Sequence, residues 1–337
     1  MKKFLISFLF SILFFPFLVL GQSLPNTDQS VSFKISPNFP RPRESATISI
    51  SSFINNLDKS EIKWYINNSL IKSGIGEKSF TFLMGDLGEN KIIKTVINKS
   101  GGGTLTKAFN LNPTEVNLIY EVDTYTPPFY QGKAWFTKQS TVKIVALPRM
   151  LDSAKRLISP QNYVYTWKID GNVIQDKSGF GKNIFTYTGP LISRDIIVSV
   201  EVSPQYSNNT ASANIALPYQ NPLLLPYEKN PIYGTIFEHA IYGDYYLNRD
   251  EVTFEIIPYF FSANNSFANL NFEWKMNGKT FETSNQKNEA TFRIENNQKG
   301  RSSISVKTNN ITKMLQLDEL DFSLFFDREK TDQSFNF

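Results

Sequence analysis

The 337-residue chain contains no cysteine and a single histidine, His239. Without cysteine there is no disulfide, no thiolate zinc site and no cysteine nucleophile. One histidine cannot form the two-histidine HExxH zinc site, and any histidine-based triad has to use His239, which lies in the aromatic stretch IFEHAIYGDYY. The sequence therefore predicts a protein that is not an enzyme, with no catalytic residue, no metal ligand and no cofactor.

A strong excess of positive charge is also missing, since 35 Lys and Arg face 31 Asp and Glu and no basic stripe is present. Nucleic acid is therefore not an expected partner. The glycine-rich stretch SGGGT at residues 100–104 has no following Lys-Ser/Thr, so it predicts a hairpin loop and not a phosphate-binding loop. Asp244, Asp250 and Glu251 lack the spacing of a calcium loop, and Arg249 is expected to neutralise Asp250.

Long hydrophobic runs are absent except at the N-terminus, where residues 4–20 follow a basic start. Val19 and Gly21 suit the −3 and −1 positions of a signal-peptide cleavage site. We predict that residues 1–21 are a signal peptide whose removal leaves Gln22 first; the alternative is an uncleaved anchor. In both cases the remainder is exported, secreted or at the cell surface, and any membrane contact is made only by an uncleaved N-terminal segment.

Three of the four tryptophans begin variants of one phrase: WYINN from Trp64, WKIDG from Trp167 and WKMNG from Trp274, roughly 105 residues apart. Each phrase follows a strand-like run, at residues 46–53, 140–147 and 251–258. The last strand of each unit is expected at 104–111, 210–217 and 311–317. Alternation with period two and breaks rich in Asn, Asp, Gly, Ser and Pro predict short strands throughout.

Strands at this density predict an all-β protein of three tandem antiparallel β-sandwich domains after the signal peptide. Each phrase tryptophan is expected in the core, on the same inner face as the Ile or Met two residues later (Met276 in the third unit). The two residues that follow, Asn-Asn, Asp-Gly and Asn-Gly in the three copies, predict a hairpin turn with positive φ. The predicted ranges are 30–113, 114–218 and 219–326, followed by a disordered tail at 327–337.

On this phrase and its tandem spacing, the chain resembles bacterial secreted tandem immunoglobulin-like repeat proteins, most closely those related to the PKD domain, over roughly residues 30–320. The resemblance implies an immunoglobulin-like sandwich for each unit. It implies no activity, because many functions occur on this fold.

The second and third units carry aromatic inserts, residues 125–136 and 228–246, that the first unit lacks. Contiguous exposed apolar residues usually mark contacts, so each insert is expected either to pack against the preceding domain or to bind a partner. The first alternative accounts for the missing insert in the unit that has no preceding domain. The candidate contact residues are Phe129, Tyr130, Trp135, Tyr233, Phe237 and Tyr242.

These features together favour a non-enzymatic, exported cell-surface or envelope scaffold or an adhesion-type protein, whose partners are envelope or surface proteins. One alternative is an accessory subunit of an envelope assembly, such as a pilus or secretion machinery. Another is a carbohydrate-binding module that uses exposed aromatic side chains, Trp135 among them.

Overall fold

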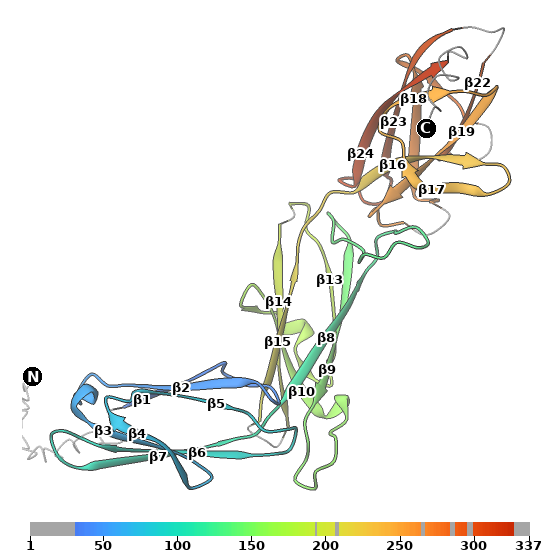
Figure 1. The fold of residues 1–337 in the computed structure, drawn as a ribbon. Coiled ribbons are helices and arrows are strands. Elements are labelled where there is room, and N and C mark those ends of the chain that lie inside the picture. Colours follow the sequence, from blue (N-terminus) through green and yellow to red (C-terminus); the bar gives the residue numbers. More distant parts are fainter. Residues whose placement is uncertain are drawn as a thin grey trace, which may run out of the picture. The chain divides into compact units, whose positions relative to one another are not determined.

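The structure, a computed structural model, describes residues 31–192, 194–205, 209–263, 267–283, 287–294 and 299–326 (Figure 1). The predicted signal peptide and the predicted tail at 327–337 lie outside these residues. Within them the chain is β-structure with three single-turn 3₁₀ helices, at Leu57–Lys59, Pro160–Asn162 and Gln175–Lys177.

The first sandwich pairs a three-stranded with a four-stranded sheet. The first sheet has the order β1-β2-β5, formed by Ser32–Ser36, Ser45–Ser51 and Ser79–Leu83. The second sheet has the order β4-β3-β6-β7, formed by Ser69–Ile75, Glu61–Ile66, Lys91–Asn98 and Thr104–Leu111. The SGGGT stretch forms the loop of the β6–β7 hairpin, as predicted.

The second sandwich repeats this order. One sheet is β13-β9-β8, formed by Ile184–Thr188, Thr141–Arg149 and Glu115–Val122. The other is β11-β10-β14-β15, formed by Asn172–Val173, Tyr163–Ile169, Ile196–Pro204 and Ala211–Leu217, with β12 (Gly179–Phe180) also paired to β10.

The third sandwich has the same central strands and one extra strand in each sheet. One sheet is β17-β16-β19-β22, formed by Gly234–Ala240, Leu223–Asn230, Glu251–Tyr259 and Glu289–Arg293. The other is β18-β24-β23-β20-β21, formed by Gly243–Leu247, Leu317–Phe326, Gly300–Asn310, Leu270–Met276 and Lys279–Phe281. The insert at 228–246 thus forms β17 and β18, at one edge of each sheet, and β18 runs parallel to β24.

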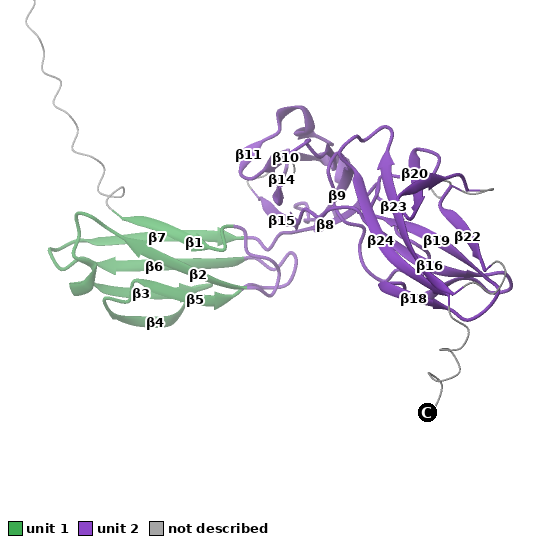
Figure 2. Cartoon of the chain, turned by 90° about the horizontal axis from the view of Figure 1, so that it is seen from above, with its two compact units in different colours: residues 1–38, 45–83, 91–111 green, residues 39–44, 84–90, 112–337 purple. Residues whose placement is uncertain are grey.

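The strand pairing thus forms three tandem antiparallel immunoglobulin-like sandwiches. They group into two compact units (Figure 2). The first unit holds the strands of the first sandwich, and the second holds the other two sandwiches together with the loops at 39–44 and 84–90.

The last strand of the third sandwich differs from the prediction. Residues 311–317 were expected to form it, but the strand is Leu317–Phe326. The preceding strand β23 extends to Asn310, whose side-chain oxygen accepts hydrogen bonds from the backbone of Thr312 and Lys313. The backbone N–H of Asn310 donates to the carbonyl of Gln316, so this segment closes into a turn.

The repeated phrase has the same structure in all three sandwiches. Trp64, Trp167 and Trp274 are buried, each on the strand that carries the phrase. Each indole N–H donates a hydrogen bond of 2.9 Å to a backbone carbonyl in the loop just before a strand of the other sheet. These strands are β5, β13 and β22. The acceptors are Glu77, Lys182 and Lys287 respectively. A single side chain therefore fills the core and satisfies a carbonyl of the facing sheet.

The residues after each tryptophan form the predicted turns. Both central residues have positive φ in every copy: Asn67 and Asn68, Asp170 and Gly171, Asn277 and Gly278. The side-chain oxygen of the first turn residue accepts a hydrogen bond from the backbone N–H of the neighbouring strand. These donors are Ile92 at 3.0 Å, Ile197 at 2.9 Å and Ser303 at 2.9 Å. The phrase thus encodes a core residue and a two-residue hairpin turn.

Met276 departs from the expectation of burial beside Trp274. It is 42% exposed and lines a cavity of about 470 Å³ together with Phe281 and Phe326. Because Met276 is the last residue of β20, it lies where the sandwich opens and fewer strands cover it.

The turn at Asp170 gives a test of acid sensitivity. The N–H of Ile197, and next Arg194, hold the pKa of Asp170 below its ordinary value of 3.8. A lowered pKa stabilises the fold above pH 3.8, and this contribution is lost as the pH falls through the folded-state pKa. Because the other two copies carry Asn here, Asp170→Asn keeps the acceptor oxygen. We expect a melting temperature near that of the wild type at pH 7 and a smaller decrease on acidification below pH ~4. A decrease equal to that of the wild type contradicts this role.

Candidate contact surface

The insert at 125–136 packs against the third sandwich. The ring of Trp135 stacks on Phe260, with centroids 4.2 Å apart and planes 15° from parallel. Tyr130 meets Phe260 and Tyr259 edge-on, at 5.7 and 6.1 Å. Tyr125 lies 4.8 Å from Phe267.

The neighbour of this insert is therefore the following sandwich and not the preceding one that we expected. The physical reason is the strand β8, which lies between the linker and the insert. It runs the length of the sandwich, so the insert emerges at the end opposite to the one where the chain enters.

Backbone and polar groups join the same two sandwiches. The N–H of Tyr125 donates to the carbonyl of Phe261, and the N–H of Phe260 donates to the carbonyl of Tyr125, both at 2.8 Å. The hydroxyl of Thr137 donates to the carbonyl of Phe260, and that of Ser262 donates to Asp123. Two strand-like hydrogen bonds of this kind fix the local orientation more strictly than side-chain stacking alone.

Gln316 lies at the centre of this junction with no exposed surface. Its amide nitrogen donates to the carbonyl of Lys138 at 2.7 Å and approaches the hydroxyls of Ser262 and Thr137 at 2.9 and 3.2 Å. Its amide oxygen accepts from the backbone N–H of Ser262 at 2.8 Å and from the side chain of Asn310 at 3.1 Å. One buried glutamine thus bridges both sandwiches, and each of its polar atoms has a partner.

Other insert side chains are left at the surface. Phe129 is 92% exposed, Tyr233 80% and Tyr242 74%. Phe237 is half-buried, 5.2 Å from the ring of Tyr227. The candidate set therefore separates into three groups: Tyr130 and Trp135 contact the third sandwich from the second, Phe237 packs within the third sandwich, and the others face solvent.

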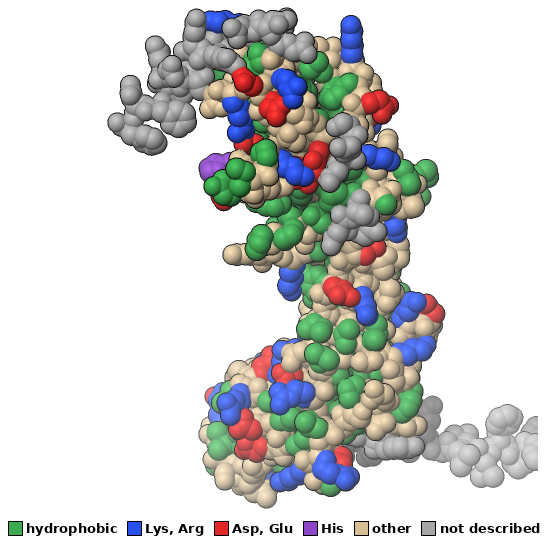
Figure 3. All heavy atoms as spheres, turned by 90° about the vertical axis from the view of Figure 1, so that its right-hand side faces the viewer, with side chains coloured by type: hydrophobic (Ala, Val, Ile, Leu, Met, Phe, Trp, Pro, Cys, Tyr) green, Lys and Arg blue, Asp and Glu red, His purple; other side chains and the backbone are tan. Residues whose placement is uncertain are grey.

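A shallow groove of about 450 Å³ lies where the insert of the second sandwich meets β17 of the third. Its lining is mostly apolar: Pro127, Pro128, Phe129, Tyr130, Gln131, Phe237, Glu238 and Tyr259. Figure 3 shows hydrophobic side chains at the surface around the chain's single histidine, which β17 carries. The groove continues the aromatic cluster of Tyr227, Tyr259 and Phe260, against which Tyr130 and Phe237 pack.

Phe129 occupies an unfavourable backbone conformation. The N–H of Tyr130 donates to the carbonyl of Pro127, which closes a four-residue turn with Pro128 and Phe129 at its centre. Phe129 has a φ of 70°. This turn position requires positive φ and strongly favours glycine, so a bulky side chain is strained there.

The titratable groups of this region include an exposed histidine, two ion pairs and a partly buried tyrosine. His239 is exposed. Arg249 pairs with Glu228, and Glu251 pairs with Arg293. Burial, and next the hydrogen bond to Glu228, raise the pKa of Tyr245 to about 12. No group of three His, Cys, Asp or Glu side chains is placed to hold a metal ion in the described part of the chain.

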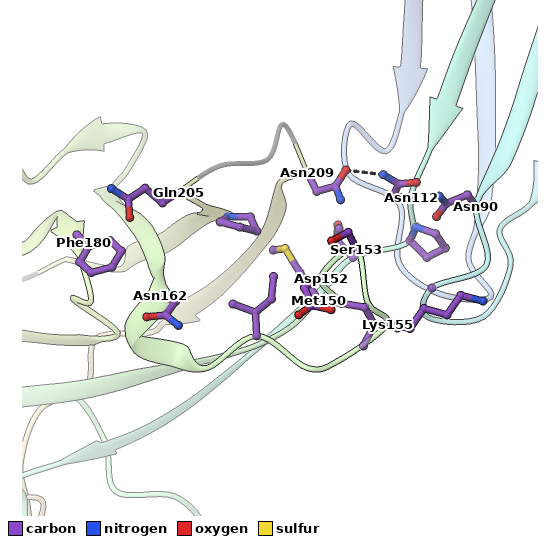
Figure 4. A pocket seen from close by; sticks show the side chains of 16 residues that line it. Asn90, Asn112, Met150, Asp152, Ser153, Lys155, Asn162, Phe180, Gln205 and Asn209 are labelled. Atoms are coloured by element: carbon purple, nitrogen blue, oxygen red, sulfur yellow. Dashed lines mark hydrogen bonds between the residues drawn. The ribbon is translucent and has the colours of Figure 1, made fainter.

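A larger cavity of about 740 Å³ lies elsewhere in the second unit (Figure 4). Its polar lining is mainly amide side chains, and Asn112 donates to Asn209 across 2.7 Å. The carboxylate of Asp152 accepts hydrogen bonds from the backbone and the guanidinium of Arg156, and the backbone bond is the main cause of its lowered pKa. The lining also includes the charged side chains of Asp152 and Lys155.

Among the residues that the structure describes, none of the helices has the length and hydrophobicity to cross a bilayer.

No protein-family model matches the chain, and no curated protein does either. Solved structures with a similar fold include the fibronectin(III)-like modules of Clostridium thermocellum CbhA, with 15% identity over 56% of this chain and 95% of that one, at a TM-score of 0.26. Immunoglobulin domains 1–4 of Sidekick-1 match with 12% identity over 88% and 74%, at 0.19. The Bacteroides ovatus glucan-utilisation protein SGBP-B, solved with a mixed-linkage heptasaccharide, matches with 13% identity over 88% and 70%, at 0.20. These low scores give no indication of function.

Proposed function

We propose that this chain is an exported, non-enzymatic scaffold or adhesion-type protein that binds another protein through the exposed insert residues of its second and third sandwiches. The apolar N-terminal run supports export, and the paired carboxylates and exposed lone histidine support a role without catalysis.

Phe129 is the observation that carries this proposal. Its positive φ is a strain of roughly 1–2 kcal/mol that glycine avoids. The residue is 92% exposed, so it adds almost no buried apolar surface to the folded chain. A side chain that weakens its own turn and stabilises little else is best explained by a contact with another molecule.

Binding of a protein is favoured over binding of a carbohydrate that stacks on Trp135. One face of its ring is covered by Phe260, and only 37% of the residue is exposed. The exposed set also includes aliphatic Ile232, which suits a protein surface better than a sugar ring.

The variant Phe129→Gly tests whether this side chain contributes to partner binding without contributing to the stability of the fold. We expect the melting temperature to stay the same or to rise, because glycine relieves the strained φ and no buried contact is lost. In-cell cross-linking of the tagged chain, followed by mass spectrometry, should then lose the partner that the wild type captures.

Phe53→Gly is the matched control, since Phe53 is fully exposed on a loop of the first unit. It should leave the captured partner unchanged. Identical partner sets for the wild type and Phe129→Gly would overturn the proposal.

A further inference from the structure

We infer that the partner at this surface is a second copy of the same chain, docked around a two-fold axis with the two β17 strands side by side. This inference rests on the proposed function and names its partner.

The first observation is that β17 ends its sheet. The order β17-β16-β19-β22 leaves the side of β17 opposite to β16 without a neighbouring strand in the described part of the chain. Such an edge presents backbone donors and acceptors to any strand that approaches it. In a two-fold pair the approaching strand is β17 of the other copy, and it runs antiparallel.

The second observation is that the surface holds both a protruding apolar tip and an apolar groove. The turn between β16 and β17 carries Ile232 and Tyr233, which are 84% and 80% exposed. The side-chain oxygen of Asn230 accepts hydrogen bonds from the backbone N–H groups of both, which fixes the tip. The groove beside Phe237 has room for these two side chains.

A two-fold axis brings each tip to the other copy's groove. Tyr233 directly precedes β17, and Phe237 lies four residues further along the chain, just past Thr235, where the regular pairing of β17 with β16 is interrupted by a register shift. A two-fold axis through Thr235 sets Tyr233 of one copy opposite Phe237 of the other, because both residues are two positions from Thr235. Both tips then meet both grooves at once.

The exposed area is adequate for a stable dimer. Phe129, Ile232, Tyr233 and Tyr242 are each at least 74% exposed. Since an aromatic side chain buries roughly 150–250 Å², the three aromatic residues, together with Ile232 and the adjacent edge strand, approach the ~800 Å² per partner of a typical interface. The groove is also continuous with the aromatic cluster that joins the two sandwiches, so the second copy would contact both.

Sedimentation equilibrium of the purified chain tests this directly. We expect a monomer–dimer equilibrium whose dissociation constant increases at least ~10-fold in Ile232→Ser/Tyr233→Ser and in Phe129→Gly. The matched control is Phe53→Ser/Ile54→Ser, which removes an equally exposed pair from the first unit and should leave dimerisation unchanged. The inference is overturned if the chain stays monomeric at all concentrations. It is also overturned if the dissociation constant of the dimer is unchanged in both Ile232→Ser/Tyr233→Ser and Phe129→Gly.

The absence of cysteine allows a second, independent measurement. Thr235→Cys places a single thiol on β17 at the proposed axis, where it faces its own copy, and oxidation should trap a disulfide-linked dimer at concentrations where Phe53→Cys stays monomeric. Equal trapping of the two variants contradicts a β17 interface. If the chain is monomeric but cross-linking in cells still captures a different protein through Phe129, the second-copy inference fails and the proposed function stands.

Discussion

Replacing Trp167 by alanine is expected to lower the free energy of unfolding of the second unit by roughly 3–5 kcal/mol. The side chain has no exposed surface, and its ring stacks on Phe185 at 5.1 Å. Removal also leaves the carbonyl of Lys182 without its indole donor. For a unit of this size the melting temperature should fall by on the order of 10 °C in differential scanning calorimetry.

Two further variants distinguish the loss of the buried ring from the loss of the indole N–H, and the second unit from the first. Trp167→Phe keeps most of the ring but loses the N–H, so it should retain more than half of the stability that the alanine variant loses. Trp64→Ala makes the same change in the first unit and should lower the melting of that unit alone, because the chain folds as two compact units. An unchanged melting profile for Trp167→Ala contradicts its role in the core.

The local structure around each tryptophan was predictable because it is encoded within five residues. The Asn or Asp pair requires positive φ, and the alternation before it places the tryptophan on one face. The acceptor of the indole N–H was not predictable. Glu77, Lys182 and Lys287 contribute only a backbone carbonyl, 13 or 15 residues further on, and no side chain marks it in the sequence.

The neighbours and the secondary structure of the two inserts could not be predicted from the sequence. The aromatic side chains of 125–136 indicated a contact, but two neighbours were available and only the direction of β8 decides between them. The insert at 228–246 was expected to make a contact, and its two strands were not predicted, although GTIFEHA and GDYYL have strand-like composition. The role of Gln316 was not predictable, because a single glutamine in a polar turn has no sequence pattern that indicates its burial by tertiary packing.

Gln316→Leu is expected to uncouple the second and third sandwiches at nearly constant volume. Leucine fills the same space but leaves the buried backbone N–H of Ser262 and the partly buried carbonyl of Lys138 without these partners. Each such loss destabilises by roughly 1–3 kcal/mol, so the two losses should weaken the junction by about 2–6 kcal/mol in total. The aromatic contacts of Trp135 and Tyr130 with Phe260 remain but do not replace these hydrogen bonds.

Calorimetry distinguishes this effect from general destabilisation. In the wild type the second unit should melt in one transition, whereas Gln316→Leu should give separate transitions for its two sandwiches. Gln175→Leu makes the same chemical change at an exposed position of the second sandwich and should preserve the single transition. Tyr130→Ser/Trp135→Ser, which removes the stacking on Phe260, should also split the transition. One unaltered transition in both junction variants would mean that the sandwiches are coupled by their linker and not by this network, because neither the polar nor the aromatic half of the interface would then contribute measurably to their cooperativity.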